Sequence, residues 1–347
     1  MSCYHPWLGV PDYDCFEDGK RTYKLMSPYD PTLKQVYPGS IAIPCGHCVG
    51  CRLDYSRSWA DRMMLELDHT KKAIFITLTY NNDHVPFTAD ENSGEFGVLS
   101  LDKTDLQKFF KRLRKRYSDK EIRFYAAGEY GTNTQRPHYH AVIFGIGIDD
   151  FKKKTPVRKN ELGQMLYTCQ ELQDLWSIRK VAKVAKVGKR GQFLKSFDKV
   201  PYYEPIGFIS FSEVSWCTCA YVARYVLKKV YGNMNYLQEQ FGAEPEFSLM
   251  SRRPGLGAYY IEDHPDMFDV SQLYVKGYDK PIRIPKYHLK KLELTDPELF
   301  DKIKNERKEY AQDKEFQKLL NTDLGFIEQL EVEENQKLSK VAALKRL

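Results

Sequence analysis

Two runs rich in β-branched and aromatic residues, 122–129 and 138–145, flank a polar segment of eight residues, YGTNTQRP. Runs of this composition are typical of β-strands, and a polar segment with Gly and Pro between them indicates a turn. The pattern therefore predicts an antiparallel pair of strands. Because strand side chains alternate between two faces, every second residue of a run is expected on the same side.

Further strands are predicted at 73–80 (AIFITLTY) and 207–211 (GFISF), which have the same composition. Helices are predicted at 55–69, 104–117 and 220–231, the second from apolar residues that recur at helical spacing. Strand, helix, strand–turn–strand, strand and helix in this order indicate a compact α+β domain, with an antiparallel sheet flanked by helices.

The remaining segments divide the chain. Residues 1–60 are rich in Pro, Gly, Tyr and Cys and are predicted to be irregular, and residues 151–200 are polar, basic and predicted to be mainly loops. The tail from Thr295 has a helical composition and a helix start signal, Thr-Asp-Pro-Glu. We therefore predict a Cys-rich N-terminal segment at 1–60, a core at 61–235 and a C-terminal extension at 236–347 that ends in helix.

The second strand of the predicted pair contains two histidines separated by one residue. His138 and His140 are expected to project from one side of the strand, and Glu129 closes the preceding strand nearby. Two imidazoles and a carboxylate can hold a metal ion and leave positions open for water or a phosphate oxygen. A His-x-His is expected about 0.2 times by chance in a chain of this composition, and the alternative is a solvent-facing polar pair.

A pair of tyrosines lies in the predicted helix at 220–231. At helical spacing, Tyr221, Tyr225 and Lys228 share one side, opposite an apolar stripe. A nearby ammonium group favours the phenolate, which is the nucleophilic form of tyrosine. With 24 tyrosines this spacing is expected about 1.6 times by chance. It also occurs at Tyr274 and Tyr278, in a segment that has the composition of a loop, and ordinary aromatic packing is the alternative.

Three cysteines follow one another at C-x2-C-x2-C spacing: Cys45, Cys48 and Cys51. Thiolates at this spacing suit a structural zinc ion, which needs a fourth ligand. Cys3 is the first choice for it, followed by Cys15 and His47. An iron–sulfur cluster and buried reduced thiols are the alternatives.

Basic residues are concentrated in two runs. The net charge is only +6, but residues 108–116 and 179–190 each carry six cations, and aromatic residues make up 14% of the chain. Clustered cations with many aromatics indicate nucleic-acid binding, and solvated charge is the alternative. The candidate DNA-binding residues are Lys108, Lys111, Arg112, Arg114, Lys115, Arg116, Arg179, Lys180, Lys183, Lys186, Lys189 and Arg190.

Membrane insertion and secretion are not expected. No apolar run approaches the roughly 20 residues that a spanning helix needs. The first ten residues lack a basic region followed by an apolar one.

Several of these motifs, in their order along the chain, resemble those of a known family. FITLTY (75–80), GEYG with RPHYH (128–140) and YVARYVLKK (221–229) are similar to the motifs of HUH-superfamily replication initiators. The resemblance is to those of microvirus bacteriophages of the gokushovirus type, which have single-stranded DNA. PCGHCVGC (44–51) and SRRPGLG (251–257) look like segments of the phage members, and the match spans about residues 40–260.

The resemblance implies an HUH endonuclease core at 61–235 and a rolling-circle mechanism. Glu129, His138 and His140 would bind Mg²⁺ or Mn²⁺. Tyr221 and Tyr225 would nick single-stranded DNA at a replication origin, keep a 5′-phosphotyrosine link and rejoin the strand, with Lys228 assisting. Host polymerase and helicase would be partners, in the host bacterial cytoplasm.

Two other functions are compatible with parts of the sequence. Two histidines and a carboxylate can hold Fe(II) in an oxygenase, but the basic runs and tyrosine pair would then have no use. A zinc-bearing nucleic-acid-binding protein without catalysis would explain the cysteines and the charge, and would leave the histidine pair unexplained.

Overall fold

The computed structural model describes residues 3–17, 20–27, 40–88, 97–131, 134–160, 163–187, 193–224, 241–275 and 278–343. These residues form two compact units. One unit combines residues from 1–58 with residues from 284–346, and the other is drawn from 59–283. The terminal segments thus share a unit, whereas the division into 1–60, 61–235 and 236–347 follows chain order and stays a prediction.

A seven-stranded antiparallel sheet organises the larger unit, in the order β12-β5-β6-β4-β11-β8-β7. The four strands predicted from composition are its central members, so the α+β class with an antiparallel sheet is confirmed. The strands are β4 (Ala73–Tyr80), β5 (Arg123–Tyr130), β6 (Pro137–Phe144), β7 (Thr155–Lys159), β8 (Met165–Thr168), β11 (Gly207–Glu213) and β12 (Phe247–Met250).

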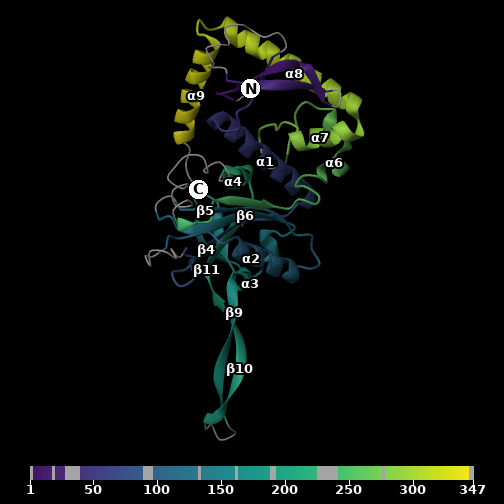
Figure 1. The fold of residues 1–347 in the computed structure, drawn as a ribbon. Helices are drawn as coiled ribbons and strands as arrows, with labels where there is room; N and C mark the ends of the chain where they lie inside the picture. Colours follow the sequence, from purple (N-terminus) through teal and green to yellow (C-terminus); the bar gives the residue numbers. More distant parts are fainter. Residues whose placement is uncertain are drawn as a thin grey trace. The chain divides into compact units, whose positions relative to one another are not determined.

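One face of this sheet packs against α2 (Lys103–Arg116) and α3 (Gln170–Leu175), as Figure 1 shows. Alternate residues of β4, β5 and β6 form a core with the apolar side of α2, which is the side predicted from its helical spacing. Its buried residues are Leu106, Phe109, Phe110 and Leu113. The opposite face of β5 and β6 contacts α4 (Trp216–Arg224). The sheet therefore separates a core from a second, functionally distinct face.

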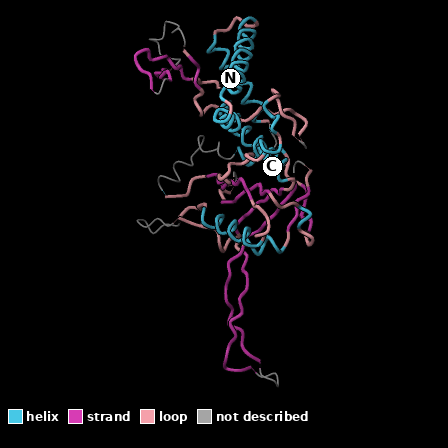
Figure 2. The backbone as a smooth tube through the Cα atoms, turned by 90° about the vertical axis from the view of Figure 1, so that its right-hand side faces the viewer, coloured by secondary structure: helices cyan, strands magenta, loops and turns pink. Residues whose placement is uncertain are grey.

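A long two-stranded ribbon extends from the larger unit (Figures 1 and 2). It consists of β9 (Ser177–Val187) and β10 (Phe193–Pro205), which pair only with each other. The prediction that residues 151–200 are mainly loops is therefore wrong. Valines alternate with lysines and alanines along β9, and the density of basic residues obscured this two-residue period.

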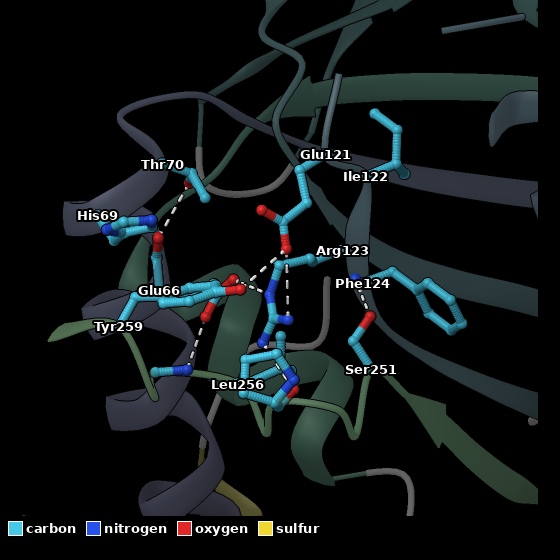
Figure 3. Close-up of polar contacts among 12 residues, drawn as sticks. Glu66, His69, Thr70, Glu121, Ile122, Arg123, Phe124, Ser251, Leu256 and Tyr259 are labelled. Carbon is cyan, nitrogen blue, oxygen red and sulfur yellow. Dashed lines mark hydrogen bonds and ion pairs between the residues drawn. The ribbon is translucent and has the colours of Figure 1, made fainter. Parts of the chain in front are cut away.

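A buried ion pair anchors the segment that follows β12 (Figure 3). Glu66, from α1 (Val49–Thr70), pairs with Arg123 of β5, and both side chains are almost fully buried. Glu66 also accepts a hydrogen bond of 2.6 Å from the backbone N–H of Gly257, and Arg123 donates one of 3.0 Å to the carbonyl of Pro254. Gly257 has a φ of +76°, which favours glycine. The segment SRRPGLG thus folds around this pair.

The smaller unit contains strands and helices from both ends of the chain. A sheet of order β2-β1-β3 corrects the prediction that residues 1–60 are irregular: β1 (Trp7–Glu17), β2 (Lys20–Met26) and β3 (Ile41–Ile43). The helical tail is confirmed, with Asp296 capping α8. Its helices are α7 (Lys286–Thr295), α8 (Pro297–Leu320) and α9 (Phe326–Ala342).

Three short helices complete the larger unit: η1 (Ile148–Asp150), α6 (Tyr260–Asp263) and η3 (Pro265–Phe268). Among the residues placed in the structure, no helix is both long enough and apolar enough to cross a membrane.

Candidate metal and nucleophile site

The register of β5 and β6 brings three predicted ligands together. Glu129 lies directly opposite His138, and the small Ala127 lies opposite His140. Glu129 Oε1 is 2.6 Å from His138 Nε2 and 2.9 Å from His140 Nε2. One ligand atom of each residue lies within 4.8 Å of the others, which suits coordination of a single ion.

Burial and charge keep this cluster ready to bind a cation. Glu129 and His140 are 2% and 6% exposed, whereas His138 is half-buried. Burial by itself raises the pKa of Glu129, but hydrogen bonds from His138 and His140 outweigh it and lower the pKa to about 2. The carboxylate is therefore ionised at neutral pH, which is the form that binds metal.

Both imidazoles are oriented by hydrogen bonds at their other nitrogen. His138 Nδ1 lies 3.0 Å from the carbonyl oxygen of Arg136 and donates to it, and His140 Nδ1 lies 2.9 Å from Thr77 Oγ1. Contacts of this kind fix the tautomer and ring direction of a metal-binding histidine. Thr77 lies opposite His140 in the β4–β6 register. Sequence reasoning placed Thr77 only as near DNA, because no local pattern reveals this pairing.

Tyr221 reaches the same face of the sheet from α4. Its ring lies 5.2 Å from the ring of His140 and 6.2 Å from that of Phe75, in edge-on geometry in both cases. Three neighbours in α4 are buried, while Tyr221 is half-buried: Cys219, Val222 and Ala223. The phenol therefore lies beside the cluster of Glu129 and the two histidines. Tyr225 and Lys228 lie outside the described residues.

The donor set fits a divalent cation. Two imidazole nitrogens and one carboxylate oxygen are a mixed set that Mn²⁺ and other first-row transition ions accept, whereas Mg²⁺ prefers oxygen ligands alone. Three protein donors leave coordination positions for water or a phosphate oxygen. The geometry fits a catalytic metal site of the open kind.

A second cluster consists of four cysteines in the smaller unit. One sulfur from each lies within 4.8 Å of the others: Cys3, Cys45, Cys48 and Cys51. The Cys45–Cys51 and Cys3–Cys48 sulfurs are 4.0 and 3.9 Å apart, far longer than a disulfide bond of about 2.05 Å. Four sulfurs around zinc at about 2.3 Å would lie roughly 3.8 Å apart. Cys3 thus occupies the fourth place predicted for it, His47 is exposed, and the side chain of Cys15 is not described.

Backbone N–H groups point at these sulfurs. The N–H groups of Tyr4, Cys45 and Cys48 donate to the sulfurs of Cys48, Cys3 and Cys45, at 3.3, 3.2 and 3.3 Å. Such donors stabilise thiolate charge. The helix α1 begins at Val49, six residues before the predicted Tyr55, so Cys51 lies in its first turn, near the positive end of the helix dipole.

The basic residues of α2 divide into two groups. Arg112 donates to the carbonyls of Leu175 and Ser177, both at 2.6 Å, and Arg114 donates to Ile122 O at 3.3 Å. Lys108 and Arg116 pair with the carboxylates of Asp105 and Glu171. Lys111 and Lys115 are exposed. Arg112 and Arg114 therefore hold the fold together, which their predicted role in DNA binding did not anticipate.

The second basic run lies on the ribbon. Arg179, Lys180 and Lys183 are exposed on β9, and Lys180 forms an ion pair with Glu204. Lys186 is in β9, although its side chain is not described. Lys189 and Arg190 lie outside the described residues.

Comparison with known proteins identifies relatives. The family of the replication-associated protein ORF2 matches residues 73–230, which include Glu129, both histidines and Tyr221. The chain is 29% identical over 315 residues to the replication-associated protein ORF2 of Spiroplasma virus 4, covering 88% of this chain and 84% of that protein. It is 30% identical over 247 residues to the replication-associated protein VP4 of Bdellovibrio phage phiMH2K, covering 69% and 62%.

A third relative is the replication-associated protein ORF4 of Chlamydia phage 1, which is 25% identical over 231 residues, or 65% of this chain and 48% of that protein. No solved structure matches significantly. The family match and the three phage relatives agree with the resemblance seen in the sequence motifs. Through residues 73–230, the chain belongs to the replication-associated protein ORF2 family.

Proposed function

We propose that this chain is a replication initiator with an HUH endonuclease core, which nicks one DNA strand at an origin and rejoins it after rolling-circle synthesis. The observation that supports it best is the position of the Tyr221 ring, 5.2 Å from His140 in a cluster of two histidines and a carboxylate. An Fe(II) oxygenase would need the same cluster but not the tyrosine. A non-catalytic zinc-bearing DNA-binding protein would need neither.

Each residue of the site has a defined task in this proposal. Glu129, His138 and His140 hold a divalent cation, Mn²⁺ or Mg²⁺, which when bound would offset charge on the scissile phosphate. Thr77 and the carbonyl of Arg136 keep both Nε2 atoms directed at Glu129. Tyr221 supplies the nucleophile next to these ligands, because α4 packs on that face of β5 and β6.

The chemistry is a transesterification that conserves the number of phosphate ester bonds. The phenolic oxygen of tyrosine forms a bond to phosphorus and loses its proton, while the bond from phosphorus to the 3′ oxygen breaks and that oxygen takes up a proton. The 5′ phosphate stays on the enzyme as a phosphotyrosine. A 3′-hydroxyl can later attack this ester and release the phenol, so rejoining needs no ATP.

A second nucleophile would let one protein cut again while the first link is occupied. We assign that role to Tyr225, with Lys228 favouring the phenolate, since a cation stabilises the ionised form. The free 3′-hydroxyl would be extended by a host polymerase in the cytoplasm of an infected bacterium. A host helicase would separate the strands, because the sequence contains no G-x-x-x-x-G-K-[ST] loop for nucleotide binding.

The double substitution Tyr221→Phe/Tyr225→Phe should abolish covalent attachment to DNA, because phenylalanine preserves the ring but lacks the oxygen. The measurement is a denaturing gel of protein incubated with labelled single-stranded origin DNA and Mn²⁺. Tyr274→Phe, which changes a tyrosine that is 73% exposed and belongs to the other spacing match, is the matched control. An adduct formed by the double variant would exclude both tyrosines as nucleophiles.

The cysteine cluster is proposed to hold a structural Zn²⁺ through Cys3, Cys45, Cys48 and Cys51. Sulfur separations of 3.9 and 4.0 Å and the converging N–H groups support this assignment. The ion would join the segment around Cys3 to the start of α1, and its binding energy would add to the stability of the smaller unit.

Cys48→Ser should therefore lower the zinc content of the purified protein from one equivalent to less than about 0.1, because three thiolates bind zinc far more weakly than four. The measurement is elemental analysis by mass spectrometry, together with the melting temperature, which should fall. Cys217→Ser, at an exposed cysteine outside the cluster, should keep its zinc. Native protein that lacks zinc, and whose melting temperature a chelator does not change, would refute the site.

A further inference from the structure

The ribbon of β9 and β10 exposes apolar side chains on both of its faces. Val181, Val184 and Val200 are 56%, 49% and 45% exposed, and the two strands pair with no other strand. A two-stranded ribbon is only marginally stable in water without a covering layer. A ribbon of 11 and 13 residues that lacks such a layer is therefore suited to contact with a partner.

Its two faces differ in charge. Cross-strand partners share a face, and the pairs Arg179↔Tyr203, Val181↔Pro201 and Lys183↔Lys199 form what we call the cationic face. No acidic residue occupies any of these six positions. On the other face Lys180 is neutralised by Glu204, beside Ile178 and Tyr202. One side of the ribbon thus carries three cations, and the ion pair lies on the other.

The cationic face continues onto α2 at the base of the ribbon. A pocket of about 260 Å³ lies there, and its lining includes Arg179 and Tyr203 from the ribbon with Asp105, Lys108 and Arg112 from α2. Arg112 holds the start of β9 through its bond to Ser177 O. The two basic runs, far apart in the sequence, therefore meet at this point, where three cations face one carboxylate.

We propose that the ribbon is an arm that lies along double-stranded DNA, with its cationic face toward the phosphates. Arg179 and Lys183 are four residues apart on one strand, which separates them by about 13 Å. This is close to the roughly 12 Å width of the major groove, and phosphates on the two sides of that groove are fixed in a duplex. Lys199, opposite Lys183, adds a second cation at the outer position.

The composition of the face favours a duplex over a single strand. Proteins that bind single strands rely on aromatic side chains on which successive bases stack. On the cationic face the residues between Arg179 and Lys183, and opposite them, are Val181 and Pro201, which offer no stacking surface. The arm rests on the proposed function only in taking DNA as the substrate, and it would hold the duplex that flanks the nicking site.

The test is Lys183→Gln/Lys199→Gln against Lys302→Gln/Lys308→Gln, which removes equal charge from α8. Affinity for a fluorescent duplex of mixed sequence is measured by anisotropy at several salt concentrations. Each lost phosphate contact should weaken binding on the order of tenfold at 0.1 M salt and reduce the slope of log K against log salt by about 0.9. The control pair should leave both quantities unchanged, and Lys183→Arg/Lys199→Arg should retain tight binding.

Two outcomes would overturn the arm. One is a loss no larger than that of the control pair. The other is an equal loss for a single strand of the same length, which would make the ribbon a single-strand track. Covalent adduct formation on a short single-stranded substrate is followed in the same variants and should persist. A missing adduct in the unsubstituted protein would count against the nicking proposal alone, because duplex affinity is measured independently.

Discussion

His140→Ala should reduce covalent attachment of the protein to DNA by a factor of about a thousand or more. The substitution removes one of three donors and leaves the carboxylate of Glu129, 2% exposed, with fewer hydrogen bonds. A bound divalent cation contributes several kcal/mol to stabilising charge in a transition state, and about 4 kcal/mol corresponds to roughly a thousandfold in rate. The measurement is the rate of adduct formation at a series of Mn²⁺ concentrations.

A matched control is His69→Ala, which removes another histidine that is hydrogen-bonded to a carboxylate, Asp263, away from the cluster. It should leave the rate of adduct formation unchanged. Calorimetric titration with Mn²⁺ gives a reading that does not depend on DNA, and His140→Ala should lose the binding that His69→Ala keeps. Native rates and native Mn²⁺ affinity in His140→Ala would remove the metal site from the proposal.

Arg123→Met should lower the free energy of unfolding by about 3–5 kcal/mol, the range observed when one partner of a buried ion pair is removed. Glu66 is 0% exposed and would keep its charge without the guanidinium. The carbonyl of Pro254 would also lose its hydrogen bond from Arg123. The measurement is urea denaturation followed by circular dichroism, with the midpoint expected to fall at an unchanged slope.

The double variant Glu66→Gln/Arg123→Met separates a charge effect from loss of packing. It should be destabilised by less than the sum of the two single variants, because neither charge then remains alone. Lys115→Met, at an exposed position of α2, is the control for removing a cation and should change stability by less than about 0.5 kcal/mol. A loss of less than about 1 kcal/mol in Arg123→Met would mean that the pair contributes little.

The strands of the large sheet were predictable because each is half-buried or fully buried. A strand such as Ala73–Tyr80 must bring apolar side chains to α2 on one face, and that requirement is written into its own residues. The ribbon β9–β10 and the sheet β1–β3 were not predicted. Their residues are largely exposed, polar or interrupted by Pro and Gly, so pairing with a distant partner defines them more than local burial does.

The candidate site shows the same division between local and distant information. Glu129 and the two histidines belong to one hairpin, so spacing and strand alternation sufficed to bring them together in the prediction. The contact of Thr77 with His140 depends on the pairing of β4 with β6, which nothing within either strand specifies. For Arg112 and Arg114, composition could not distinguish guanidinium groups that bind backbone carbonyls from those available to phosphate.

The alternation of β6 has a consequence for how this protein can vary in length. His138 and His140 face one side of the strand while Tyr139, Ala141 and Ile143 enter the core on the other. Gain or loss of one residue within Pro137–Phe144 would send the imidazoles into the hydrocarbon interior and the tyrosine outward. Natural insertions and deletions in this hairpin should therefore be confined to the connection at 131–136, where evolution can lengthen the chain without exchanging the two surfaces.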